Sequence, residues 1–365
     1  MTLEAIRERL SALDRQLIQL IAERQALSRE VARAKQADGR GTRDFARERD
    51  VLMQARAAAE SLDVSPDLAE SVLRLLIRGS LTTQERIRIA AGGRGGGRSA
   101  LVIGGAGKMG RWFAEFLTSQ GFAVTVADPG ASLEGFRCIA DWRGDPLDYD
   151  LIVVATPLRV ANVILQELAA RKPRGVVFDI GSLKTPLREG IGALREAGCR
   201  TTSVHPMFGP DTELLSGRHV IFIDLGDRQA LEEVQELFSS TMAELVVMSL
   251  DEHDRLIAYV LGLSHALNIA FFTALAESGE AAPRLAQLSS TTYDAQVDVA
   301  SRVAADSPEL YFEIQYLNDY GRESLLALRR ALDRLWRTVS TGDAADFTRM
   351  MLQGREYLAG RVRER

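Results

Sequence analysis

Cysteine is scarce in this sequence, with only Cys138 and Cys199 among 365 residues. Two thiols cannot form a disulfide framework or a cysteine-rich zinc site, so we expect both to be small buried side chains. Positive charge is not in excess either, because 45 Lys and Arg are opposed by 50 Asp and Glu, which gives a net charge of −5. This balance argues against nucleic acid or an anionic membrane as a partner.

Long hydrophobic stretches and an apolar leader are missing as well. No run of about 18 apolar residues occurs, and the first residues, MTLEAIRERL, are charged from position 4 onward. We therefore expect a soluble, cytoplasmic protein. Histidine is rare, with four residues, and none is spaced with cysteines or clustered carboxylates as a metal site requires. No metal is expected.

What is present is an ordinary globular composition, 46% hydrophobic and 26% charged, whose length predicts two to three domains. The glycine run GGRGGG at residues 92–97 indicates a flexible linker. The sequence before it has helical periodicity, strand and helix patterns alternate after it, and only helical patterns follow residue 246. We expect an all-α domain at 1–90, a linker at 91–98, a doubly wound α/β domain of Rossmann type at 99–246, and an all-α domain at 247–365.

The first segment has apolar residues at steps of three and four from Leu3 to Val31, which predicts a helix of about 34 residues and roughly 50 Å. Two shorter helices are expected after it, one starting near Asp44 and one capped by Ser65 with Pro66 in its first turn. Three such helices cannot enclose a core of their own. We therefore expect a homodimer in which the long helices pack against each other.

Two cations interrupt the apolar stripe of the long helix. Arg24 and Lys35 are 11 residues apart in the sequence, which places them on one face and about 16 Å apart along the axis. Burial of cations without partners is unfavourable. Two of them on one seam therefore favour an anion-binding pocket over side chains that reach solvent at the edge of the stripe.

The stretch IRERLSALDRQLIQLIAERQALSREVARAK, followed by RDFARERDVL, resembles the all-α chorismate mutase domain over about residues 3–88. The resemblance implies an intertwined dimer that rearranges chorismate to prephenate, with one arginine reaching into the partner subunit's site. Bidentate arginines suit carboxylates, and a lysine suits charge that develops on an ether oxygen. The implied carboxylate contacts are Arg7, Arg24, Arg47 and Ser80, the ether-oxygen contacts are Lys35 and Gln84, and the hydroxyl contacts are Asp44 and Glu48, with Arg7 as the residue that crosses to the partner.

A second motif, GAGKMG at residues 105–110, lies between the strand-like LVI and the helix-like RWFAEFL. The strand-like FAVTVA and an acidic residue follow, and this full context makes the motif a strong dinucleotide fingerprint. The acidic residue favours a ribose diol over a 2′-phosphate, so we expect NAD rather than NADP. DLIVVATP and GVVFDIGS predict further parallel strands. The expected cofactor contacts are Gly105, Gly107, Lys108, Met109, Gly110 and Asp128.

The histidines differ in context. His205 ends a strand pattern ahead of a proline, so we expect it at the carboxyl edge of the sheet, where such sheets bind ligands. His253, in LDEHDR, is expected to face solvent or to donate a structural hydrogen bond. His265 lies in an apolar helix, where a core histidine is the ordinary interpretation. His219 is expected to be structural.

The motifs GGAGKMG, DIGSLK, HPMFGPD and YDAQVDVASR together resemble prephenate dehydrogenase. With the first domain included, essentially the whole chain resembles the bifunctional chorismate mutase/prephenate dehydrogenase. The resemblance implies NAD-dependent oxidative decarboxylation of prephenate to 4-hydroxyphenylpyruvate in tyrosine biosynthesis, and a C-terminal domain that completes the substrate site and a dimer interface. It implies His205 as the base for the C4 hydroxyl proton, Ser182 and Lys184 at the nicotinamide end, and His265 and Arg302 as substrate contacts. A neutral histidine suits that proton transfer.

Asp294 departs from the pattern of the fused family, in which an arginine follows the tyrosine that is Tyr293 here. An acidic side chain facing the substrate would favour an amino group, so 4-amino-4-deoxychorismate and 4-amino-4-deoxyprephenate are the alternative substrates. An exposed Asp294 would leave the hydroxyl series in place. A mutase-like domain that only dimerises is a second alternative, although its charged residues argue against it. Tyrosine feedback and coupling between the two sites stay open.

Overall fold

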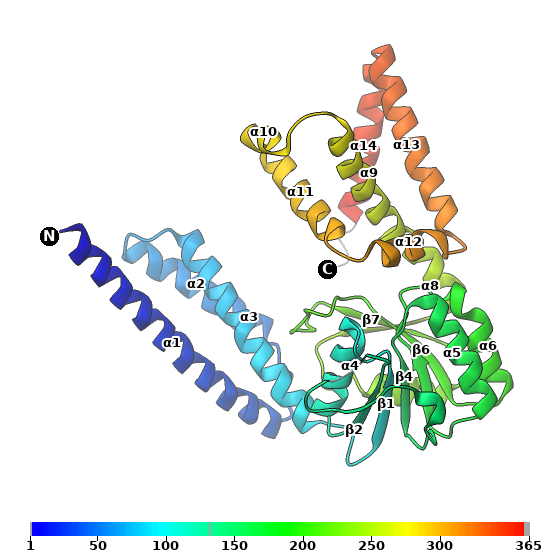
Figure 1. Cartoon of the computed structure of the whole chain (residues 1–365). Helices are drawn as coiled ribbons and strands as arrows, with labels where there is room; N and C mark the ends of the chain where they lie inside the picture. The colour runs from blue at the N-terminus through cyan, green and yellow to red at the C-terminus, as the bar shows by residue number, and fades with distance from the viewer. Residues whose placement is uncertain (1, 131–132, 361–365) are drawn as a thin grey trace. The chain divides into compact units, whose positions relative to one another are not determined.

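The structure is a computed structural model that describes residues 2–130 and 133–360. The chain divides into two compact units, Met1–Ser182 with Leu187–Ser249, and Leu183–Pro186 with Leu250–Arg365. The first unit holds the N-terminal helices and the sheet, and the second holds the C-terminal helices (Figure 1). The predicted order of an all-α part, an α/β part and a second all-α part is confirmed.

Three helices form the N-terminal part, and both α1 and α2 pack against α3. The side chain of Ser65 caps α3 by accepting a hydrogen bond from the Leu68 N–H at 3.4 Å, and Pro66 lies in the first turn. These are the start signals that the sequence predicts. The helices are α1 (Leu3–Ala37), α2 (Phe45–Ser61) and α3 (Pro66–Ala91).

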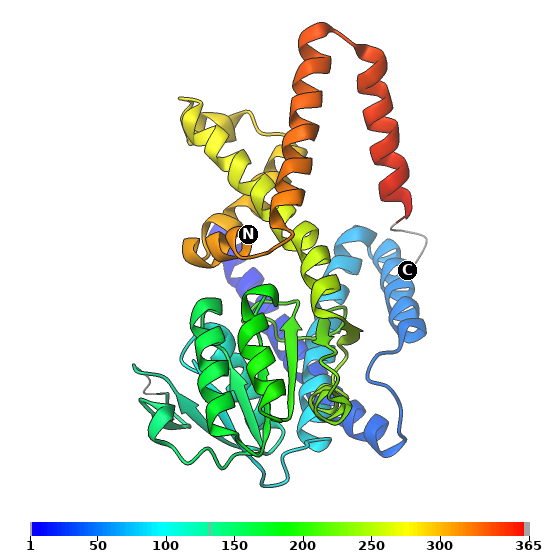
Figure 2. The same cartoon turned by 90° about the vertical axis from the view of Figure 1, so that its right-hand side faces the viewer.

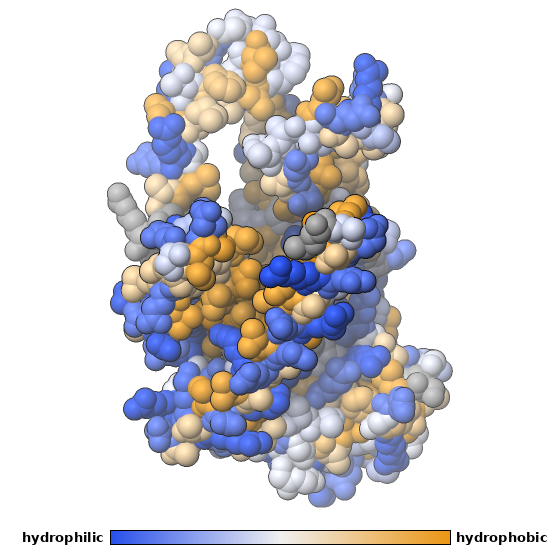
Figure 3. Space-filling model, turned by 90° about the vertical axis from the view of Figure 1, so that its left-hand side faces the viewer, coloured by the Kyte–Doolittle hydropathy of each residue, from blue (hydrophilic) through white to orange (hydrophobic). Residues whose placement is uncertain are grey.

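The apolar stripe of α1 is not covered by the other described residues of the chain. Leu10, Leu17 and Leu20 are 55%, 58% and 61% exposed. Figure 3, seen from the side on which α1 lies in Figure 1, shows hydrophobic side chains gathered on this face. As expected from the sequence, the three helices leave a large apolar surface exposed over the residues that the structure describes.

The α/β part contains an eight-stranded sheet in the order β3-β2-β1-β4-β5-β6-β7-β8, counted over the described residues. Strands β1 to β6 are parallel to one another, which the unbroken apolar runs predict. The strands are β1 (Ser99–Ile103), β2 (Ala123–Ala127), β3 (Arg137–Ile139), β4 (Leu151–Val154), β5 (Val176–Asp179), β6 (Thr201–Pro206), β7 (His219–Ile223) and β8 (Glu244–Met248).

The last two strands run the other way: β7 pairs antiparallel with β6, and β8 pairs parallel with β7. No helix connects β6 to β7, so the chain returns directly as an antiparallel strand. Helices connect most of the other strands and cover the sheet (Figure 1). They are α4 (Lys108–Ser119), α5 (Leu158–Arg171), α6 (Arg188–Glu196) and α7 (Arg228–Glu236), with short 3-10 helices at Trp142–Gly144 and Thr185–Leu187.

The glycine run between α3 and β1, predicted to be a flexible linker, is packed at Gly95, whereas Gly96 and Gly97 are exposed. Gly95 is buried, and its N–H donates to the carbonyl of Gln120 at 2.9 Å. A Cβ on Gly95 would lie 2.2 Å from the carbonyl carbon of Gly121. Glycine is needed here because two backbone segments approach closely, and composition alone cannot distinguish that need from flexibility.

The second unit is helical apart from Leu183–Pro186. Helix α8 continues through a π-helix into α9, and α13 and α14 form an antiparallel hairpin (Figure 2). The continuous helix Leu250–Glu277 contains an 18-residue window of mean hydropathy 1.6, which is long and apolar enough to cross a membrane by length and composition alone. The helices are α8 (Leu250–Ile257), the π-helix (Ala258–Leu263), α9 (Ser264–Glu277), α10 (Ala282–Gln287), α11 (Thr291–Ala304), α12 (Pro308–Tyr316), α13 (Gly321–Thr341) and α14 (Ala344–Gly360).

Candidate active sites

A cavity of about 400 Å³ lies among α1, α2 and α3. It gathers residues that are up to 60 positions apart in the sequence, and its lining includes every predicted mutase residue except Arg7. Arg7 is exposed on α1 and does not line it. The predicted residues that line the cavity are Arg24, Lys35, Asp44, Arg47, Glu48, Ser80 and Gln84.

Arg24 lies on the wall between α1 and α3. Its Nη1 donates to the hydroxyl of Ser80 and to the carbonyl of Leu76, the latter at 2.6 Å. Ser28 donates to the same Ser80 hydroxyl at 2.8 Å, which fixes that side chain. Burial lowers the pKa of Arg24, but a guanidinium stays charged at any ordinary pH. No carboxylate among the described residues pairs with it, so this wall presents positive charge to the cavity.

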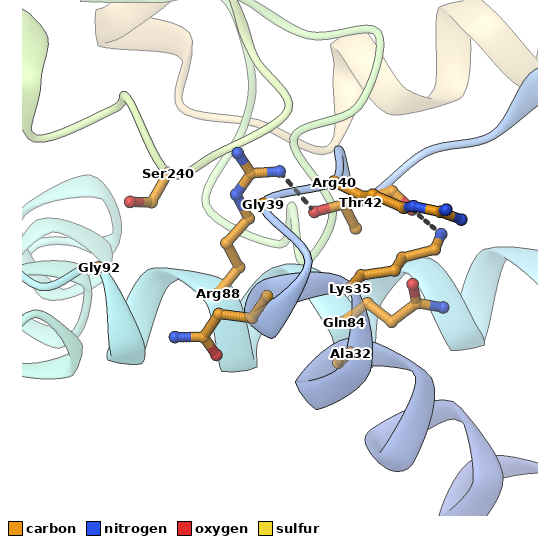
Figure 4. A pocket seen from close by; sticks show the side chains of 10 residues that line it. Ala32, Lys35, Gly39, Arg40, Thr42, Gln84, Arg88, Gly92 and Ser240 are labelled. Carbon is orange, nitrogen blue, oxygen red and sulfur yellow. Dashed lines mark hydrogen bonds between the residues drawn. The ribbon is translucent and has the colours of Figure 1, made fainter.

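Lys35 and Gln84 lie at the other end of the cavity. The Lys35 ammonium donates to the carbonyl of Thr42 at 2.6 Å. Arg88 lines the adjoining pocket drawn in Figure 4 and donates to the Thr42 hydroxyl at 3.2 Å. The Gln84 Oε1 atom is buried and has no hydrogen-bond partner among the described residues. Thr42 and Arg88 were not predicted from the sequence, because nothing distinguishes them from other polar residues of a loop and a helix end.

The two acidic residues already have partners. Asp44 caps α2 by accepting a hydrogen bond from the Arg47 N–H at 2.9 Å, and Glu48 forms an ion pair with Arg43 at 3.0 Å. Both partners belong to the same short stretch of chain. The acids are therefore held in place at the rim of the cavity.

Next to Gln84, Glu85 points away from the cavity and into the α/β part of the same unit. Its side chain is 1% exposed, and its carboxylate accepts hydrogen bonds from the backbone N–H groups of Leu215 at 2.8 Å and Met242 at 2.5 Å. Desolvation raises the pKa of Glu85 and outweighs the two backbone hydrogen bonds, which lower it. This carboxylate attaches the mutase-type helix to two loops that flank β7 and β8.

Glu85→Ala should lower the free energy of unfolding by about 2 kcal/mol or more, because two buried N–H donors lose their acceptor. Arg86→Ala is the matched control, since the Arg86–Glu213 pair is exposed and should contribute under about 1 kcal/mol. The folded state holds the Glu85 proton more tightly than the unfolded chain does. The contribution of this raised pKa to the free energy of unfolding is therefore full below the ordinary glutamate pKa and declines as the pH rises through the raised value. Equal denaturant midpoints for the two variants would contradict this role.

The dinucleotide motif forms the turn between β1 and α4. Gly104 has φ +82, and a Cβ on Gly110 would lie 2.2 Å from the Gly104 carbonyl oxygen. Gly107 is the N-cap of α4 and has no side chain that could cap the helix. Lys108 and Met109, the first residues of α4, follow it directly. The turn follows β1. In the sheet β1 lies next to β4, and the order of the strands reverses between these two neighbours. These residues fit a dinucleotide pyrophosphate.

The acidic residue of the fingerprint and the strand-end residues lie at the same edge of the sheet. Asp128 follows β2 directly, and its Oδ2 is 3.3 Å from the Ala106 N–H of the glycine turn. His205, 5% exposed, is at the carboxyl end of β6, and Ser182 follows β5. The first unit thus brings Asp128, Ser182 and His205 to the carboxyl ends of its parallel strands.

The second unit carries the predicted substrate contacts and Lys184. The His265 Nδ1 atom is buried without a hydrogen-bond partner among the described residues, and the ring lies edge-on to Tyr311 at 4.4 Å. Burial lowers the pKa of His265, which Asp306 only partly opposes. Arg302 is exposed on α11, which packs on α9, and Lys184 is fully buried. Asp294, also exposed, accepts a hydrogen bond from Ser289 at 3.2 Å.

His253 is fully buried against Asp254, with its Nδ1 2.6 Å from the carboxylate. The option that it faces solvent is therefore wrong, and the option of a structural hydrogen bond is what the structure shows. The charged neighbours in LDEHDR gave no sign of this burial.

Three family profiles match the chain. Two of them match stretches of the first unit, and the third matches the helices of the second unit. They are "Chorismate mutase type II" at residues 6–85, "Prephenate dehydrogenase, nucleotide-binding domain" at 113–247, and "Prephenate dehydrogenase, dimerization domain" at 249–353. The second match begins after the glycine turn, so the fingerprint at 105–110 rests on its own sequence and geometry.

Individual relatives agree. The T-protein of Enterobacter agglomerans is 29% identical over 318 residues, which cover 86% of this chain and 81% of that protein. A 4-amino-4-deoxyprephenate dehydrogenase of Streptomyces pristinaespiralis is 32% identical over 272 residues, covering 71% and 90%. The crystal structure of prephenate dehydrogenase from A. aeolicus shares the fold, with a TM-score of 0.56 at 18% identity over 72% of this chain and 98% of that one.

The fold and the two sites define a dinucleotide-dependent dehydrogenase joined to an all-α mutase domain. The chain belongs to the bifunctional chorismate mutase/prephenate dehydrogenase family.

Proposed function

We propose that this chain rearranges chorismate to prephenate in the α1–α3 cavity and oxidises prephenate, with loss of CO₂, to 4-hydroxyphenylpyruvate at the carboxyl edge of its sheet. The observation that carries the proposal is the lining of the α1–α3 cavity. Residues of three helices that suit two carboxylates and an ether oxygen converge on one space of about 400 Å³. NAD is the cofactor that the glycine turn and Asp128 fit.

In the mutase site, Arg24 and Arg47 bind the substrate carboxylates, with Arg7 of a second subunit as a further contact. Lys35 and Gln84 donate hydrogen bonds to the ether oxygen of the substrate. When the substrate binds, the Lys35 ammonium leaves the Thr42 carbonyl and donates to that oxygen. Asp44 and Glu48 contact the substrate hydroxyl, and Ser80 contacts one of the substrate carboxylates. The reaction is a pericyclic rearrangement, so the residues hold a compact conformer and stabilise charge on the breaking bond.

In the dehydrogenase site, bound NAD⁺ supplies the hydride acceptor. The glycine turn and the N-terminus of α4 hold the pyrophosphate, and Asp128 accepts from the ribose hydroxyls. His205 accepts the C4 hydroxyl proton, while the ring carboxylate leaves as CO₂ and its electron pair restores aromaticity. Ser182 and Lys184 line the nicotinamide end, and His265 and Arg302 bind substrate. The Nδ1 atom of His265, which has no hydrogen-bond partner within the part of the chain that the structure describes, supports this role.

Asp128 should make NAD⁺ the preferred cofactor, because its carboxylate repels a 2′-phosphate. Asp128→Ala should narrow the kcat/KM preference over NADP⁺ by roughly tenfold, which corresponds to removing about 1.4 kcal/mol of repulsion. Glu115→Ala is the control, since Glu115 is an exposed acid on α4 that pairs with Arg111. A wild-type enzyme that prefers NADP⁺ would overturn this assignment.

A homodimer is part of the proposal. The exposed leucines of α1 support it, as does the position of Arg7 outside the cavity of its own chain. The apolar helix Leu250–Glu277 lies in the segment that matches the dimerization domain, and Asn268 within it is buried and hydrogen-bonded to Gln296 at 2.9 Å. We assign this helix to a subunit interface of a cytoplasmic enzyme. Tyrosine is the candidate feedback inhibitor to add to both assays.

Two assays test the function against its alternatives. Loss of chorismate without NAD⁺ distinguishes a working mutase from a domain that only dimerises. NADH formation with prephenate, compared with 4-amino-4-deoxyprephenate, identifies the substrate series. We expect a higher kcat/KM for prephenate, because Asp294 is exposed and bonded to Ser289. Two observations favour the amino series instead, namely the departure of Asp294 from the family pattern and the similarity to the Streptomyces relative. A higher kcat/KM for the amino substrate would establish that series.

A further inference from the structure

The connection that follows β5 packs as part of the helical unit. Leu183–Pro186 belongs to the same compact unit as Leu250–Arg365, although the chain on both sides of it belongs to the sheet unit. Asp254 of α8 holds this segment. Its carboxylate accepts hydrogen bonds from the backbone N–H groups of Lys184 at 2.9 Å and Thr185 at 2.6 Å.

Other contacts within the helical unit complete the attachment. The Thr185 hydroxyl donates to the carbonyl of Leu317 at 3.3 Å, and Asn318 donates to the carbonyl of Asp254 at 2.9 Å. The segment is therefore joined both to α8 and to the turn before α13. Such a set of hydrogen bonds fixes the peptide planes of residues 184 and 185 and not merely the position of the loop.

His253 orients the carboxylate. Its Nδ1 is 2.6 Å from Asp254 Oδ1, and both side chains are fully buried. A buried carboxylate is stable only when its oxygens are bonded, and here three N–H donors converge on them. Desolvation raises the pKa of Asp254, but the hydrogen bonds from His253 and Thr185 outweigh it, so the pKa lies below its ordinary value and the group is ionised at neutral pH.

We propose that Asp254, oriented by His253, is a positioning residue of the dehydrogenase that fixes the 183–186 segment and thereby sets Ser182 and Lys184 at the nicotinamide end of the site. This inference rests on the proposed dehydrogenase function. Ser182 is covalently joined to the anchored segment, and Lys184 lies within it. An error of about 1 Å in such groups can lower the rate about 10²-fold.

Asp254→Asn tests the anchor, because an amide of the same shape turns one acceptor into a donor against the N–H groups. We expect the dehydrogenase kcat to fall about 10²-fold, while the Kd for NAD⁺, measured by fluorescence titration, changes less than threefold. Mutase activity of the same protein should be unchanged, and Arg255→Gln, an exposed neighbour on α8, should behave as wild type. A merely structural role would lower the melting temperature and leave kcat intact below it, which would overturn the proposal.

The role of His253 is tested by two replacements. An asparagine can place an N–H donor where Nδ1 stands, so His253→Asn should keep most of the dehydrogenase kcat and the wild-type pH profile, whereas His253→Ala should lose about as much as Asp254→Asn. Equal losses in both His253 variants, with a changed pH profile, would show that His253 transfers protons instead.

Hydrogen exchange keeps the test independent of turnover. The amides of residues 184 and 185 should exchange slowly in the wild type and much faster in Asp254→Asn. Similar exchange in both proteins would refute the anchor. Wild-type protein with slow exchange at these amides but no oxidation of prephenate or its 4-amino analogue would instead refute the proposed function.

Discussion

Lys35→Ala is expected to lower the mutase kcat by about 10²–10³-fold, the range found when one preorganised donor to developing charge is removed. Lys35 and Gln84 both line the α1–α3 cavity, and among the described residues the ammonium of Lys35 bonds to a neutral carbonyl, that of Thr42. The charge is therefore available to the ether oxygen of the substrate. Chorismate consumption in the absence of NAD⁺ measures the loss.

The same variant should still oxidise supplied prephenate, because the dehydrogenase residues lie on other elements. Arg33→Ala is the matched control: this arginine is exposed on the same helix and lines no described cavity near the site. Its mutase kcat should be within twofold of wild type. Loss of both activities in a folded Lys35→Ala protein would show that the two sites are not separate.

Local signals in the sequence predicted most of the fold. Ser65 with Pro66 gave the start of α3, and the glycine turn with Asp128 gave the β1–α4–β2 unit, because each depends on backbone geometry within a few residues. The stripe position of Arg24 and Lys35 depends only on helical periodicity, and both side chains line one cavity. Helix faces and tight turns depend on residues that are close together in the sequence, so they can be predicted from it.

Features that depend on distant segments were not predictable in this way. Glu85 stands in the charged run QERIR, which is typical of a solvated helix face, yet two loops more than 120 residues later bury its carboxylate. Gly95 is required by a backbone segment at Gly121, and the 183–186 segment is held by Asp254. In each case at least one of the two contacting groups is a backbone group, which leaves no mark in the composition of its segment.

His205→Asn is expected to lower the dehydrogenase kcat by about 10²–10⁴-fold, the contribution of a positioned acid–base group. His205 is nearly buried at the carboxyl end of β6, and its strand is fixed on both sides by β5 and β7. An asparagine fits the same backbone but cannot accept a proton. The Kd for NAD⁺ should change little, because the glycine turn and Asp128 hold the cofactor.

The pH dependence of kcat separates proton transfer from mere packing by His205. A histidine base must be neutral to accept the hydroxyl proton, so the wild-type kcat should fall on the acidic side, and that acidic limb should be absent in His205→Asn. His219→Asn is the matched control: His219 is a second histidine at a strand end, and it pairs with Glu244 at 3.0 Å on the surface. That variant should keep both the rate and the limb. An intact acidic limb in His205→Asn would mean that another group takes the proton, and His265, whose Nδ1 has no partner among the described residues, would be the next residue to replace.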